Sequence, residues 1–149
     1  MILPPNKLPP PFSRLDPTQC WQKPNGTLWL YRPAPHVIVS VTVGHLHSDS
    51  LRAFLQACAP AFESGRVWLV QDAELATGYD SQARIDTTEW LMRERHRIRG
   101  SILLTTNKLV LMGASVAGIV LSAVGVAGEI TSDRKVFDRA LLDAVREAR

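Results

Sequence analysis

The stretch from Arg66 to Ile98 constrains the fold of this chain more than any other. It begins with a short apolar run, Val67 to Val70, which stops at Gln71-Asp72 and predicts a buried strand. Asp80 and Ser81 then stand where a helix start needs capping side chains, ahead of a long segment without Gly or Pro. We therefore expect both residues at a strand-to-helix junction, which is where open α/β folds place their sites.

The same stretch resembles the central motif of STAS domains, the family of the bacterial anti-sigma-factor antagonists. In that family a buried strand ends in Asp, and Asp-Ser-Ser-Gly follows eight residues later, with its first Ser phosphorylated by a partner kinase. Asp72 and Asp80 have this spacing, and Ser81 occupies the phosphorylated position, although Gln82-Ala83 replace the Ser-Gly of the family. The order of expected elements also fits the family from about Gly26 to the end of the chain.

The resemblance implies a non-enzymatic protein-interaction or signalling module of bacterial regulation. Its partner-binding surface would be the junction with Tyr79, Asp80, Ser81 and Arg84, and Ser81 would be the candidate phosphorylation site. The partner would be a regulatory protein, for example an anti-sigma-type kinase, and no cofactor is implied. A homodimer stays open as an oligomeric state.

The composition indicates one domain in a reducing compartment. A chain of 149 residues with 46% hydrophobic residues is long enough for one real core and too short for two ordinary domains. A net charge of +3 is a mild basic bias, so we expect no nucleic-acid partner. Cys20 and Cys58 lie in dissimilar contexts, which favours two free thiols and a cytoplasmic location.

The N-terminal residues 1–25 form a Pro-rich arm, and the α/β domain is expected over residues 26–149. The arm has neither a basic start nor an apolar core of signal-peptide length, so secretion is not indicated. We expect it to lie extended on the domain, with Phe12 and Trp21 tucked against it. The alternative is a ligand for a proline-binding module through Pro9-Pro10-Pro11.

The remaining patterns predict an α/β fold with a mixed, mostly parallel sheet, an antiparallel first strand pair and covering helices. Strands are expected at 27–31, 37–43, 67–70, 102–104 and 129–131. Helices are expected from His45–Ser50, from Asp80, over 109–128 and after Ser132-Asp133. Pro60 should end or kink the first helix. STAS domains have the same order of elements.

The segment from Leu109 to Gly128 has no charge across its length, so its environment is ambiguous. Its length is near the roughly 20 residues that a membrane span needs, but its many small residues make it weakly hydrophobic. We expect a core helix buried against the sheet. The apolar face of this helix could instead line a cavity, which gives the alternative function of a small-ligand or lipid-binding module related to STAS and SEC14-like folds.

Chemistry-bearing motifs are sparse. The best metal candidate is His45-Leu46-His47 with Asp49, and a polar loop with a helix cap is its ordinary alternative. The basic run from Arg93 to Arg99 suits either a solvated helix end or an anion site. Gly113 to Gly118 lacks the second Gly of a nucleophile elbow, and no His follows His96. No workable combination of nucleophile and base is present, so we expect no enzyme, no cofactor and no metal centre.

Overall fold

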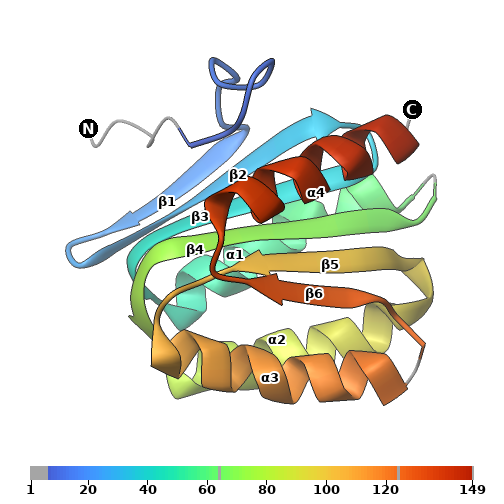
Figure 1. Ribbon diagram of the computed structural model, residues 1–149. Helices are drawn as coiled ribbons and strands as arrows, with labels where there is room; N and C mark the ends of the chain where they lie inside the picture. The colour runs from blue at the N-terminus through green and yellow to red at the C-terminus, as the bar shows by residue number, and fades with distance from the viewer. Residues whose placement is uncertain (1–6, 64, 124, 149) are drawn as a thin grey trace.

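The structure, a computed structural model, describes residues 7–63, 65–123 and 125–148, and the side chains of residues 116–121 lie outside this description. Six strands form one sheet whose spatial order equals the order in the chain (Figure 1). Pairing is antiparallel from β1 to β3 and parallel from β3 to β6. The predicted mixed α/β sheet with an antiparallel first pair is therefore confirmed. The strands are β1 Gln19–Lys23, β2 Gly26–Ala34, β3 Val37–Leu46, β4 Val67–Tyr79, β5 Ile98–Leu104 and β6 Gly128–Thr131.

Helices cover both faces of the sheet. Three of them lie on one face and α4 lies on the other (Figure 1), where it contacts β5 and β6 and shares a core with residues of β2 to β5. Cys58 ends α1, and a short 3-10 turn over Ala59–Phe62 follows because Pro60 cannot continue the α-helical hydrogen-bond ladder. A second 3-10 turn, Arg95–Arg97, follows α2. The helices are α1 Ser48–Cys58, α2 Ser81–Glu94, α3 Lys108–Ala123 and α4 Arg134–Glu147.

Side chains alternate between two cores because successive residues of a strand point to opposite faces. In β2, Leu28 and Leu30 pack in the core under α1 and α2, while Trp29 and Tyr31 pack in the core under α4. Both faces of the central strands are therefore apolar. This explains why β2 and β3 appear in the sequence as nearly continuous β-branched and aromatic runs.

The N-terminal segment is docked on the domain, and its end belongs to the sheet. Leu8 is buried in the core under α4, and Phe12 packs against the same core. Trp21 lies in β1, an edge strand that the sequence analysis did not predict, and its ring makes an edge contact with Phe54 at a centroid distance of 6.0 Å. Residues 1–6 of the predicted arm lie outside the described residues.

Strand β4 is much longer than the predicted strand over residues 67–70. It continues through Gln71, Asp72 and Glu74 to Tyr79, paired with β3 in parallel along nearly its whole length. The predicted end at Val70 is wrong, because pairing with β3 carries the strand on through its polar residues. Asp72 is 1% exposed yet remains in the strand, since Arg134 of α4 lies against its carboxylate.

Helix α3 is shorter and more exposed than the buried core helix predicted over Leu109–Gly128. It ends at Ala123, and Gly128 already belongs to β6. Val110 and Ala114 pack toward the sheet, but Met112 is 61% exposed. Among the residues that the structure describes, no helix has the length and apolar character needed to cross a membrane. Thus the first turns of α3 contact the sheet with one side and present apolar side chains on the other.

Candidate functional site

The predicted strand-to-helix junction is present where β4 ends and α2 begins. Asp80 has an extended backbone (φ −66°, ψ 141°) and is the N-cap residue of α2, and Ser81 is the first helical residue. The Asp80 side chain does not cap its own helix. Its carboxylate instead accepts hydrogen bonds from the neighbouring connection between β3 and α1, which makes the junction a link between two strand-to-helix connections.

The contacts of Asp80 come from His45 and from the start of α1. His45 Nε2 lies 2.7 Å from Asp80 Oδ1, and the backbone N–H of Ser48 donates to Asp80 Oδ2 at 2.8 Å. Because His45 and then the Ser48 N–H hydrogen-bond to this carboxylate, the pKa of Asp80 is lowered from its ordinary value. The carboxylate is thus held in its ionised form at the carboxyl end of β3 and β4.

Of the other three predicted partner-binding residues, Tyr79 makes a hydrogen bond within the protein, and Ser81 and Arg84 are exposed. The Tyr79 hydroxyl donates to the backbone carbonyl of Leu109 at 3.2 Å, so it attaches the start of α3 to the end of β4. A side chain at Gly113 would collide with the Tyr79 hydroxyl, which shows how closely α3 approaches here. Ser81 and Arg84 are exposed, and Arg84 makes no ion pair with any residue in the described parts of the chain.

Large apolar side chains are exposed on the helices beside this junction. On α3, Leu109 is 46% and Met112 is 61% exposed, and Leu111 is also exposed. On α2, the next residue after Arg84 is Ile85, which is 40% exposed. The Tyr79–Leu109 hydrogen bond places the start of α3 directly at the junction. The exposed apolar side chains of α2 and α3 therefore lie beside the polar residues of the junction.

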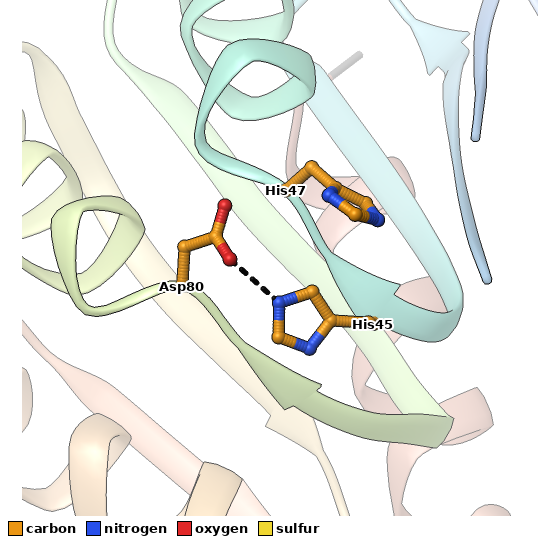
Figure 2. A group of neighbouring side chains, drawn as sticks. All are labelled: His45, His47 and Asp80. Carbon is orange, nitrogen blue, oxygen red and sulfur yellow. Dashed lines mark hydrogen bonds and ion pairs between the residues drawn. The ribbon is translucent and has the colours of Figure 1, made fainter. Parts of the chain in front are cut away.

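Two histidines and Asp80 converge at the same junction (Figure 2). One potential ligand atom from each of His45, His47 and Asp80 lies within 4.8 Å of the others. Asp49, which the sequence analysis grouped with the two histidines, instead forms an ion pair with Lys23 of β1. The third member of the cluster comes from a different part of the chain, so its proximity is a product of the parallel pairing of β3 and β4.

A cavity of about 260 Å³ lies between the sheet and the helices α1, α2 and α3. Tyr79 and Arg84 are among its lining residues, so the cavity adjoins the junction. Most of the lining is apolar, and a few polar groups from the sheet face the same space. Representative apolar residues are Leu28, Ala76, Leu103 and Val110, and the polar ones include Ser40 and Thr42.

Comparison with known proteins bears on the fold. No protein-family model and no curated protein matches the sequence. Among solved structures, an uncharacterized protein of the DUF3478 family from Shewanella loihica PV-4, described as having a SpoIIAA-like fold, superposes with a TM-score of 0.56. The match covers 81% of this chain and 94% of that one, at 13% sequence identity. The chain has a SpoIIAA-like fold.

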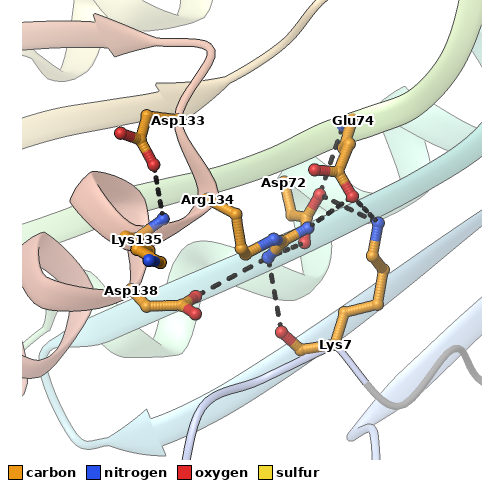
Figure 3. Close-up of polar contacts among 7 residues, drawn as sticks. All are labelled: Lys7, Asp72, Glu74, Asp133, Arg134, Lys135 and Asp138. Carbon is orange, nitrogen blue, oxygen red and sulfur yellow. Dashed lines mark hydrogen bonds and ion pairs between the residues drawn. The ribbon is translucent and has the colours of Figure 1, made fainter.

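This SpoIIAA-like fold contains a charged cluster on the face of the sheet opposite the cavity (Figure 3). Arg134 Nη1 lies 2.8 Å from Asp72 Oδ2, and Arg134 Nη2 lies 3.1 Å from Glu74 Oε1. Lys7 Nζ lies 2.6 Å from the same Glu74 oxygen. Asp72 is therefore a structural residue that joins β4 to α4, although its spacing from Asp80 was part of the resemblance noted in the sequence.

The basic run at the end of α2 is divided among separate partners in this SpoIIAA-like fold. Arg95 donates to the backbone carbonyl of Met92, Arg97 lies 3.8 Å from Glu94, and Arg99 lies 2.6 Å from Glu147. The guanidinium of Arg99 also lies over the Trp68 ring. The contacts of Arg95 and Arg97 stay within the end of α2 and the 3-10 turn that follows it, while those of Arg99 join β5 to α4 and to β4.

Sequence reasoning missed two features of the SpoIIAA-like fold that concern the site. Asp80 was not connected with His45, because they are far apart in the chain and meet only through strand pairing. The cavity-facing polar residues Ser40 and Thr42 were also missed. A signal for the second existed, since Ser and Thr alternate with Val in an otherwise apolar strand and therefore share one face.

Proposed function

We propose that this protein is a non-enzymatic binding module whose protein partner docks where β4 meets α2 and α3 begins. The observation that supports this best is the exposed apolar surface formed at the start of α3 by Leu109 and Met112, which the Tyr79 hydrogen bond joins to the junction. Exposed apolar side chains rimmed by polar groups are typical of protein interaction sites. The partner is a regulatory protein that also contacts the exposed Ser81 and Arg84.

The docking surface can be tested by exchanging its apolar centre for charge. Met112→Glu should abolish capture of the partner from the native host, because a buried unpaired carboxylate is costly in an interface. Val136→Glu is a matched control, since Val136 is 40% exposed on α4, on the opposite face of the sheet. Equal capture by the wild type and Met112→Glu would reject this surface.

Ser81 offers this module a switch. Its position at the N-terminus of α2 would let a phosphate meet free backbone N–H groups and the positive end of the helix dipole. Phosphorylation would add nearly two negative charges to the docking surface without disturbing the fold. We expect Ser81→Ala to keep the partner and Ser81→Asp to weaken capture. Unchanged capture by Ser81→Asp, with no phosphate found at Ser81 in cells, would remove the switch and leave the docking surface in place.

A second candidate function, binding of a small apolar ligand, is favoured by the cavity of about 260 Å³. Ligand pockets usually occupy roughly 300–1,000 Å³, so this one suits a compact molecule. Ala76→Leu would place a larger side chain into the space, while Ala123→Leu adds the same groups at an exposed site. Native mass spectrometry of the purified protein should show a ligand retained by Ala123→Leu and lost from Ala76→Leu. Protein that is free of ligand in all forms would eliminate this function.

A further inference from the structure

The ends of β3 and β4 bring together three side chains of the types that bind transition-metal ions. His45 and His47 are alternate residues at the end of β3, so their side chains leave the backbone on the same side. Asp80 follows β4, whose Tyr79 pairs with Leu46. The pairing thus places Asp80 opposite His47, and Figure 2 shows the three side chains converging.

The hydrogen bonds around this group hold it in a form suited to metal binding. The side-chain amide oxygen Oδ1 of Asn25 lies 2.5 Å from His47 Nε2 and accepts a hydrogen bond from its N–H, which leaves His47 Nδ1 with a free lone pair. Such a bond to the outer ring nitrogen is what orients histidine ligands in metal sites. The Ser48 N–H holds the Asp80 carboxylate in a similar way.

The group is also accessible and close to the required size. The side chains of His45 and Asp80 are 30% and 39% exposed, so an ion can reach them from solvent. His45 Nε2 and Asp80 Oδ1 are 2.7 Å apart, and a tetrahedral ion with ligand bonds near 2.05 Å would separate them to about 3.3 Å. The His45–Asp80 pair would therefore open by about 0.6 Å, and ligand atoms of the group that lie up to 4.8 Å apart would close toward the same spacing, as an ion replaces the shared proton.

We propose that His45, His47 and Asp80 form a binding site for a divalent transition-metal ion, with zinc as the best fit. Two imidazoles and a carboxylate are ligands that zinc accepts, and the exposure leaves a fourth position for water. A bound ion would connect the N-cap residue of α1 to that of α2 and so tie the two strand-to-helix connections together. The evidence for this site does not rest on the proposed partner-binding function, although Asp80 lies at the same junction.

The test uses the full chain, without a polyhistidine tag and with Cys20→Ser to remove the exposed thiol. After chelation, titration with zinc should show a single ion per chain, and cobalt should give the visible absorption of a tetrahedral site. Zinc should also raise the melting temperature, because it binds only the folded chain. The double variant His45→Ala/His47→Ala should lose the cobalt spectrum and the thermal shift, whereas His96→Ala, at the far end of α2, should keep both.

Asn25→Ala gives a second test that keeps all three ligands. It should weaken zinc binding by about 10-fold or more, since it removes the group that orients His47. Zinc titrations of the wild type that match those of the double histidine variant would overturn the site. The site would also be overturned if Asn25→Ala bound zinc as tightly as the wild type and cobalt gave no tetrahedral spectrum. Both results would indicate that zinc binds to scattered surface ligands.

Discussion

At the scale of single residues, Asp72 is linked to stability through a buried ion pair. Its carboxylate is buried in the middle of β4, and Arg134 lies against it from α4. Removing one partner of such a pair leaves the other charge without compensation, while removing both is much less costly. Its effect is therefore on folding, whereas Asp80, at the same spacing as in the STAS motif, lies at the exposed junction.

We predict that Asp72→Leu lowers the free energy of unfolding by about 3 kcal/mol, the lower end for a broken buried ion pair. The lower end is expected because Arg134 keeps Glu74 as a partner and is 26% exposed. The double variant Asp72→Leu/Arg134→Leu should recover most of the loss in urea unfolding experiments. A double variant that is as unstable as the sum of the two single variants would contradict a coupled pair.

Glu74 gives a prediction for acid stability. Lys7, and to a lesser extent Arg134, lowers the pKa of Glu74 from its ordinary value of 4.5. The ionised form is thus favoured in the folded state, so the stabilisation is complete above pH 4.5 and is lost as the pH falls through the lowered pKa. Glu74→Gln should flatten the decline in melting temperature below pH 4.5. If the melting temperatures of the wild type and Glu74→Gln declined identically below pH 4.5, the ionisation of Glu74 would not be coupled to folding.

At the scale of elements, local signals predicted helix starts well. Asp80 and Asp133 are the N-cap residues of α2 and α4, as expected, although only Asp133 caps its helix with its side chain. Strand ends were predicted poorly, because β4 extends through polar residues that are tolerated only where β3 and Arg134 supply partners. The cluster of His45 with Asp80 depends on the same pairing. These partners come from distant parts of the chain, so the sequence around each residue does not indicate them.

The N-terminal segment gives a prediction at this scale. Leu8 is 6% exposed in the core under α4, so Leu8→Ala should reduce stability by about 2 kcal/mol. Leu15→Ala is the matched control, since Leu15 is 37% exposed and should change the melting temperature little. Equal melting temperatures for the two variants would indicate that the segment is dispensable for the fold.

At the scale of the whole molecule, the two faces of the sheet differ in packing and in what they expose. The face under α4 holds a packed core and the ion cluster of Asp72 and Arg134. The face under α1, α2 and α3 contains the cavity, the junction and the exposed apolar start of α3. The structural neighbour supports the architecture, and the proposed binding function rests on this asymmetry of surfaces.

Site-specific photo-crosslinking in the native host tests the proposed binding function most directly. A photoreactive amino acid in place of Met112 on α3, and in a second protein in place of Val136 on α4, compares two exposed apolar positions on opposite faces. The account predicts that Met112 yields a discrete crosslink to a different protein and that Val136 does not. Crosslinks of equal intensity at both positions, or at neither, would contradict it.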